Sequence, residues 1–279
     1  VAAEEVMDEV LSGYAAESGL SFTLVAEEVG ERVYGDDPEA WIILDIVDGS
    51  REIGADLGAA YSIGGTAPGP GRPTLADVEV AAQTELMPTK QWIGDQFVWS
   101  GDEPVHRQFV HAASGVQYRD PPHDFVQPGA IEDRFWCWCR PFQGPDPVID
   151  DVRTALEDRV LAESDDIYPA TYISTAAQLA NLATGRYTVA VDLRPAARRR
   201  GATDDHVARP YDLAASRIFD AMQVPIYQVD PDAGTVREGV RTDFGIEEPV
   251  AWIAYANPMI EETVHDELCD VLTEMDILA

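Results

Sequence analysis

The residues best suited to chemistry follow an apolar run in the first third of the chain. Residues 41–44 read Trp-Ile-Ile-Leu, and Asp45, Asp48, Gly49 and Ser50 come directly after them. A short run rich in branched side chains is typical of a buried strand, and here two aspartates follow it. Two carboxylates at the end of a buried strand repel each other and lose hydration, so a cation or hydrogen-bond donors must compensate them.

A hard divalent cation such as Mg²⁺ suits this pattern, because it prefers carboxylate oxygens and keeps positions open for water and substrate oxygens. Gly49 would let the backbone approach a phosphate closely, and the Ser50 hydroxyl could orient a water molecule. The alternative is an ordinary Asp-Gly turn at the end of a strand. Other segments of the chain are needed to distinguish a metal site from an ordinary turn.

Two other segments place acids in comparable positions. Residues 24–26 form a short apolar run that is followed by Glu27 and Glu28. Far downstream, Asp212 stands at the predicted start of a helix of small residues, where a helix N-terminus favours anions.

The three segments together resemble the inositol monophosphatase family of Mg²⁺-dependent, lithium-sensitive phosphatases. That superfamily also includes fructose-1,6-bisphosphatases and 3'-phosphoadenosine-type nucleotidases. Residues 26–28 match the family's G-E-E motif, residues 45–50 its D-P-I-D-G-T/S motif and residues 211–215 its W-D-x-A-A motif, in the family's order. Residues 173–177 and 183–186 resemble its G-S-A-A segment and the A-x-G-R that ends the next helix.

The resemblance implies an α/β protein with the family's layered αβαβα sandwich, usually built as a homodimer. It also implies two or three Mg²⁺ ions. In the family's arrangement, Glu27, Asp45 and the carbonyl of Val47 would hold the first ion. Asp45, Asp48 and Asp212 would hold the second.

The same resemblance implies roles for the remaining site residues. Ser50 and Glu27 would orient the attacking water, so that Glu27, Asp45 and Ser50 form the catalytic set. The amides of Gly49 and Ser50 would bind the phosphate, and Ser174 and Asp192 would meet the alcohol portion of the substrate. The expected reaction is hydrolysis of a small sugar or polyol phosphate of the inositol-1-phosphate type.

Three departures from the family pattern have consequences. Ile46 replaces a proline and Tyr211 a tryptophan, but the carboxylates are kept. The family's water-activating aspartate, from a T-x-x-D motif, would fall just ahead of Val1. The chain is therefore expected to lack its N-terminal start, unless an acid among residues 4–8 substitutes.

Three alternatives remain open. A fructose-1,6-bisphosphatase needs a cation for its second phosphate, and Arg194 or the cluster 198–200 could supply it. A 3'(2'),5'-bisphosphate nucleotidase needs a pocket for a base, which residues 130–170 could build. A noncatalytic relative would keep the metals and lack the water-activating aspartate.

Composition narrows the class of protein. The chain has 279 residues, 51 acids against 19 bases, and a formal net charge of −32. Lys90 is the sole lysine, and this pattern indicates adaptation to a salt-saturated cytoplasm, as in halophilic archaea. Such a surface repels nucleic acid and anionic lipid. Because neither a membrane span nor a signal peptide is visible, a cytoplasmic protein is expected.

The predicted elements support one layered fold over residues 1–279, with lobes at about 1–148 and 149–279. The first residues predict a helix with Val6, Val10 and Leu11 facing inward. Residues 65–71 predict a loop. In the last third, residues 226–229 and 250–256 predict strands and residues 259–272 a closing helix, an alternation typical of α/β layers.

Overall fold

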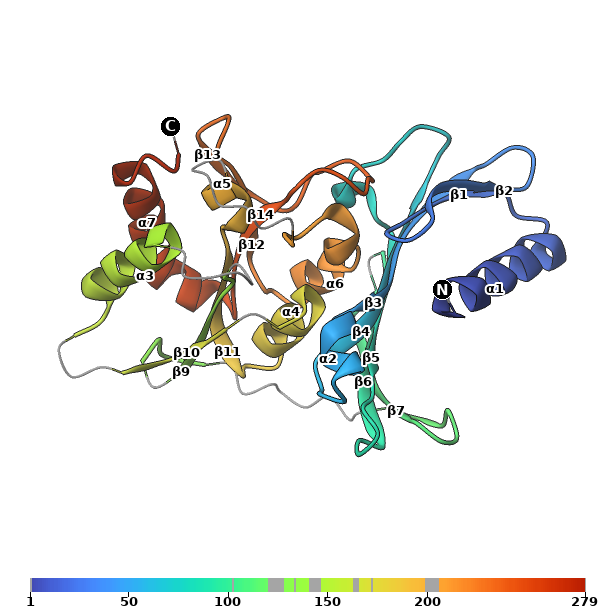
Figure 1. Cartoon of the computed structure of the whole chain (residues 1–279), viewed down its shortest axis with the longest axis horizontal. Coiled ribbons are helices and arrows are strands. Elements are labelled where there is room, and N and C mark those ends of the chain that lie inside the picture. Colours follow the sequence, from blue (N-terminus) through green and yellow to red (C-terminus); the bar gives the residue numbers. More distant parts are fainter. Residues whose placement is uncertain are drawn as a thin grey trace.

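The computed structural model describes residues 2–101, 103–119, 128–132, 134–140, 147–162, 166–171, 173–198 and 206–278. In that part of the chain the strands form two sheets, which stand roughly side by side with helices between them and outside them (Figure 1).

The first sheet has eight strands in the order β2-β1-β3-β4-β5-β6-β7-β8. Its strands are β1 Phe22–Ala26, β2 Gly30–Tyr34, β3 Ala40–Asp48, β4 Ala60–Pro68, β5 Val80–Leu86, β6 Ile93–Ser100, β7 His106–His111 and β8 Gln117–Arg119. All neighbouring pairs are antiparallel except β1 and β3, which run parallel. The parallel pair brings the carboxyl ends of β1 and β3 to the same edge.

The second sheet has six strands in the order β10-β9-β11-β14-β12-β13. Its strands are β9 Arg134–Trp138, β10 Ile167–Ala170, β11 Tyr187–Asp192, β12 Ile226–Asp230, β13 Thr235–Glu238 and β14 Ala251–Tyr255. In chain order the first strand of this sheet is β9, which precedes residue 148.

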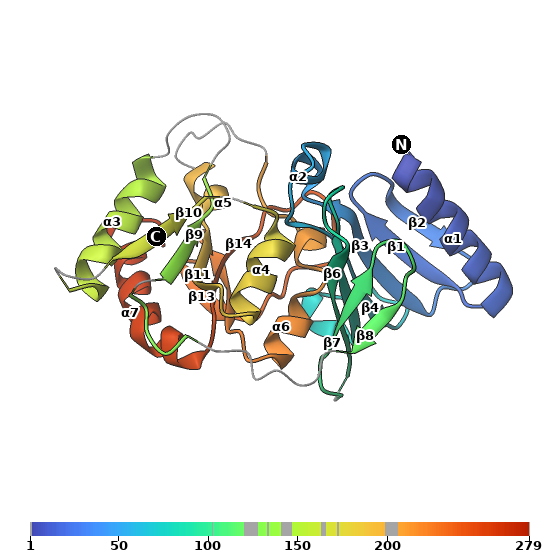
Figure 2. The ribbon, with the colours of Figure 1, turned by 90° about the horizontal axis from the view of Figure 1, so that it is seen from below.

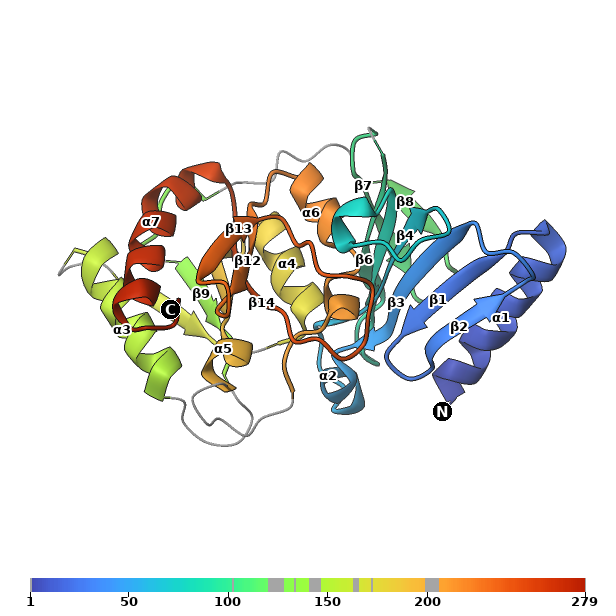
Figure 3. The same ribbon diagram turned by 90° about the horizontal axis from the view of Figure 1, so that it is seen from above.

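The helices complete five layers. They are α1 Ala2–Ser18, α2 Ser50–Gly54, α3 Pro147–Val160, α4 Thr175–Ala183, α5 Arg194–Arg198, α6 Ser216–Ala221 and α7 Pro258–Glu274, with the 3-10 turns η1 Leu75–Asp77 and η2 Pro210–Leu213. Figures 2 and 3 show α4 and α6 between the two sheets, α1 outside the first sheet, and α3 and α7 outside the second. This confirms the αβαβα arrangement that the family resemblance implied.

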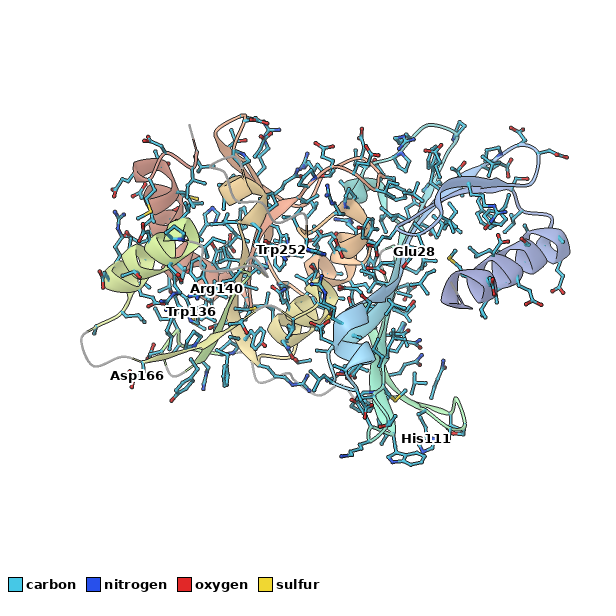
Figure 4. The ribbon with its side chains drawn as sticks, in the orientation of Figure 1. Glu28, His111, Trp136, Arg140, Asp166 and Trp252 are labelled. Carbon is cyan, nitrogen blue, oxygen red and sulfur yellow. The ribbon has the colours of Figure 1, made fainter. Side chains whose placement is uncertain are left out.

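The middle layer is possible because α4 is made mostly of small residues. Eight of its nine residues are buried, so the helix packs against β4 of the first sheet and β11 of the second at once. Trp252 on β14 faces this layer (Figure 4) and belongs to the same buried cluster as Phe97 and Phe219. Burial of these large apolar surfaces holds the two sheets together.

Two local predictions were wrong. In α1, Met7 is the buried residue, while Val6 and Val10 are each 61% exposed. The helix is rotated so that Met7, Leu11 and Ala15 pack on β1 and β2. The predicted loop at residues 65–71 begins later, because β4 continues through Pro68. Both residues of the Gly64-Gly65 pair lie within a strand, where close packing from neighbouring elements favours a missing side chain.

Candidate metal centre

A β-bulge brings Asp45 and Asp48 to the same side of β3. In a regular strand, residues three apart point to opposite faces. Here Asp45 pairs with Ile63 and Asp48 with Tyr61, so that three steps along β3 match two along β4. The extra residue changes the alternation, and both carboxylates reach one cavity. The Val47 amide inside the bulge donates a hydrogen bond to Asp45 Oδ1 at 2.9 Å.

Glu27 reaches the cavity from the neighbouring parallel strand. Ala26, the last residue of β1, pairs with Leu44 on β3, so Glu27 follows β1 at the level of Asp45. Its side chain is exposed and lines the cavity. Glu28 lies in the same turn, at the end of β1 that points toward the second sheet (Figure 4).

Asp212 comes from η2, a short 3-10 turn where the sequence predicted the start of a longer helix. Its Oδ2 accepts a hydrogen bond from the Arg209 amide at 2.6 Å and caps the turn. The turn lies against β4 at Gly65, where a Cβ atom would come within 2.4 Å of the Ala214 carbonyl oxygen. A glycine is therefore needed at position 65 for η2 to lie this close to the sheet.

Asp45, Asp48 and Asp212 form a cluster whose carboxylate oxygens lie within 4.8 Å of one another. Asp45 and Asp48 are buried, and Asp212 is partly buried. Burial, followed by repulsion from Asp212, raises the pKa of Asp45 to about 8. Burial raises the pKa of Asp48 and Asp212 well above the usual range too, with added repulsion from Asp45 and Asp48 respectively.

The partners of this cluster are neutral. Asp48 Oδ2 accepts a hydrogen bond from the Ala176 amide at 2.6 Å and is also close to the Ser174 hydroxyl. Among the described residues, no ion pair involves any of the three carboxylates. Converging oxygen ligands with uncompensated charge are the donor set that a hard divalent cation such as Mg²⁺ or Ca²⁺ prefers. The residues present thus fit such an ion.

Gly49 and Ser50 turn the chain from β3 into α2. Gly49 has a φ of 97°, in the left-handed region. A Cβ atom there would lie 3.0 Å from Ala60 Cα and 3.1 Å from the Ala59 oxygen. Glycine is favoured for both reasons. The turn leaves Ser50 exposed on the wall of the cavity, next to Asp48.

The cavity has a volume of about 460 Å³ and is lined by both acidic and basic side chains. The carboxylates and Glu52 line it, and Arg51, Arg194, Arg209 and His206 also line it. Arg51, His206 and Arg209 carried no signal that singled them out in the sequence, although they flank the acidic motifs: Arg51 follows Ser50, and His206 and Arg209 precede Asp212.

Two predicted substrate-binding residues lie behind the cavity wall. Ser174 is fully buried and caps α4, where its hydroxyl accepts a hydrogen bond from the Ala177 amide at 3.1 Å. Asp192 is fully buried and binds the guanidinium of Arg194 through Nε at 2.8 Å and Nη2 at 2.5 Å. The structure thus places them in support of Asp48 and Arg194. Of the basic cluster 198–200, residues 199 and 200 lie outside the described residues.

Comparisons with known proteins agree with this architecture. No family model and no curated protein matches the sequence. The holo fructose-1,6-bisphosphatase of Leishmania major matches the structure with a TM-score of 0.63 and 14% identity, over 95% of this chain and 80% of that one. A calcium-bound inositol monophosphatase family protein from Staphylococcus aureus matches with a TM-score of 0.57 and 13% identity, over 96% and 81%.

A third match is a dual-specific inositol monophosphatase/NADP phosphatase bound to D-inositol-1-phosphate. Its TM-score is 0.56 at 14% identity, over 97% of this chain and 81% of that one. At such identities the likeness concerns the fold. The chain therefore has the layered αβαβα fold seen in structures of inositol monophosphatases and fructose-1,6-bisphosphatases. In the described part of the chain, no helix combines the length and apolar character that crossing a membrane requires.

Proposed function

We propose that this protein is a Mg²⁺-dependent phosphomonoesterase that hydrolyses a small phosphorylated sugar or polyol. The observation that carries the proposal is the cluster of Asp45, Asp48 and Asp212, whose oxygens converge within 4.8 Å in a cavity. Since burial and mutual repulsion raise their pKa values, a bound cation would stabilise the ionised forms.

In this proposal the three aspartates hold Mg²⁺, and Glu27 and the Val47 carbonyl complete the ligand set. When bound, Mg²⁺ supplies a Lewis acid that activates water and neutralises charge on the phosphate and the leaving oxygen.

The protein groups around the ions position the reactants. The Ser50 hydroxyl and the Glu27 carboxylate orient the water for attack on phosphorus. The amides of Gly49 and Ser50 donate to the phosphate oxygens. The leaving alcohol would lie near Arg194, which lines the cavity and is held by Asp192.

A second candidate is a bisphosphate substrate, and the arginines of the cavity favour it. Arg51, Arg194 and Arg209 line the same cavity as the carboxylates. Guanidinium groups bind phosphate well because their donors match its geometry. A second phosphate on a sugar or a nucleotide would bind to Arg51 or Arg209, because the guanidinium of Arg194 is paired with Asp192.

The test is phosphate release at high KCl, with and without Mg²⁺, from inositol-1-phosphate, fructose-1,6-bisphosphate and 3'-phosphoadenosine-5'-phosphate. We expect release from at least one of them that requires Mg²⁺ and falls more than about 100-fold in Asp45→Asn. Asp37→Asn, an exposed carboxylate outside the cavity, is the control and should keep full activity. A folded protein that releases no phosphate from any of the three substrates would favour the noncatalytic alternative.

A further inference from the structure

A histidine and a cysteine lie in contact on α7, apart from the acidic cavity. His265 Nε2 and Cys269 Sγ lie 3.5 Å apart, one turn of the helix from each other. The helix packs outside the second sheet, on the face opposite α4 (Figures 1 and 3). Neither residue lines the acidic cavity.

The spacing of the two atoms suits one tetrahedral metal ion. Zinc lies about 2.3 Å from a cysteine sulfur and about 2.0 Å from a histidine nitrogen. Two such bonds at a tetrahedral angle separate sulfur from nitrogen by about 3.5 Å. The observed distance, which in the metal-free protein is that of a thiol–imidazole hydrogen bond, therefore matches the separation that a zinc ion requires.

The imidazole of His265 is held between two tyrosine side chains. The hydroxyl of Tyr255, a fully buried residue on β14, lies 3.2 Å from Nδ1. The Tyr227 ring lies beside the imidazole, with ring centroids 4.1 Å apart. A metal-binding histidine usually has its other ring nitrogen fixed by such a partner, which sets the tautomer. With the proton on Nδ1, Nε2 presents its lone pair to Cys269.

The charge on α7 favours a cation, although Arg159 of α3 pairs with Glu267 and Glu274. Helix α7 carries six acids and no lysine or arginine: Glu261, Glu262, Asp266, Glu267, Asp270 and Glu274. His265 and Cys269 are each half-buried, so an ion and its remaining water ligands can reach them from solvent.

We propose that His265 and Cys269 form a binding site for a soft divalent cation of the zinc type. Binding forms a sulfur–metal bond and a nitrogen–metal bond, and the thiol proton passes to solvent. Water molecules complete the coordination. The ion ties the two helical turns of α7 to Tyr255 on β14, and so stabilises the outer layer.

Cobalt(II) titration of the full-length protein tests this proposal, because a thiolate bound to Co²⁺ gives charge-transfer absorption that carboxylate sites lack. We expect one equivalent of Co²⁺ to produce this band in the presence of excess Mg²⁺, and Zn²⁺ to displace it. The band should vanish in Cys269→Ser and persist in Cys137→Ser, a fully buried cysteine in the second sheet.

Two further variants distinguish the proposed ligand His265 from Tyr255, which only positions it. His265→Gln should weaken the affinity for Co²⁺ at least about tenfold, and Tyr255→Phe should weaken it by about tenfold through loss of the hydrogen bond to Nδ1. Zn²⁺ should raise the melting temperature of the wild type and leave that of Cys269→Ser unchanged. A folded wild type without the band at millimolar Co²⁺, or an equal band in Cys269→Ser, would overturn the proposal.

Discussion

Each carboxylate of the cluster is costly in the absence of a cation. Asp45 is 1% exposed and Asp48 3% exposed, and their hydrogen-bond donors are neutral amides and a hydroxyl. A buried charge with neutral partners either takes up a proton or binds a counter-ion. The same residues therefore make the metal-free protein sensitive to pH and give it affinity for a divalent cation.

We expect the metal-free protein to lose stability as pH rises toward about 8. The folded-state pKa of Asp45 is raised to about 8, so the folded protein holds this proton more tightly than the unfolded chain. The resulting stability is present below the ordinary carboxyl pKa and is lost as pH rises through the folded value. Thermal unfolding in EDTA at about pH 6 and about pH 8.5 measures this loss of stability.

Two comparisons separate the contribution of Asp45 to this pH dependence from that of the other acids. Asp45→Asn cannot titrate, so its melting temperature should change less between the two pH values. Saturating Mg²⁺ should remove most of the difference in the wild type, because the ion stabilises the ionised cluster. Equal pH dependence in the wild type and Asp45→Asn would contradict the assignment.

The buried pair of Asp192 and Arg194 makes a separate prediction. Asp192 is 0% and Arg194 3% exposed, and three N–H groups of the arginine donate to the carboxylate. Arg194→Met should cost about 3–5 kcal/mol, because it leaves a buried carboxylate without its partner. The double variant Asp192→Leu/Arg194→Met should recover much of that loss. Denaturant unfolding of the variants measures both, and a double variant less stable than Arg194→Met would contradict this explanation.

The elements around the site determine where its residues point. The bulge in β3 aligns Asp45 with Asp48, and the turn at Gly49 directs the chain into α2. Asp48 in turn accepts the amide of Ala176 in the first turn of α4, whose carbonyl accepts a hydrogen bond from Gln83 on β5 at 2.9 Å. Strand, turn and helix are thus connected through one carboxylate.

Substitution of Gly49 tests the importance of this turn. Gly49→Ala would force a positive φ on alanine and place its Cβ against the backbone of residues 59 and 60. We expect a loss of about 1–3 kcal/mol in unfolding free energy and a marked fall in phosphatase activity. Gly54→Ala, in the same short helix, meets no atom within 4 Å and is the matched control. Similar losses in the two variants would show that the turn is not special.

The sequence predicted the acids of the site better than the geometry that joins them. Asp45, Asp48, Asp212 and Glu27 each follow or begin an element with a recognisable pattern, so their identity could be inferred. The bulge could not, because it depends on pairing with β4, and residues 45–48 carry no local signal for it. Asp192 and Ser174 were assigned to substrate by resemblance, whereas their burial depends on packing between two sheets. The rotation of α1 was missed because Val6 and Met7 are both apolar.

The whole molecule carries a large negative charge on a layered core. A formal charge of −32 creates self-repulsion that opposes the compact state, and dissolved ions screen it. The core consists of two large clusters, one between the sheets and one beneath α3 and α7, and a smaller one beneath α1. Salt therefore acts on the surface, while the apolar layers set the fold.

We expect KCl to raise the melting temperature substantially between low salt and about 1 M, where the screening length falls to about 3 Å. Because this rise in melting temperature comes from screening of like charges, an uncharged osmolyte at equal osmolality should give a smaller rise. Scanning calorimetry across the salt series measures it. A melting temperature that stays constant with KCl, or that falls, would contradict the role of self-repulsion.

The most direct test of the central claim is the Mg²⁺ dependence of phosphate release in the wild type and Asp212→Asn. Asp212 reaches the cluster from a segment far from β3, so its loss tests the assembled centre as a whole. We expect release by the wild type to rise with Mg²⁺ and saturate, and release by Asp212→Asn to fall more than about 100-fold. Release that needs no divalent cation, or equal release from the folded variant, would contradict the assignment of this cluster as a catalytic metal centre.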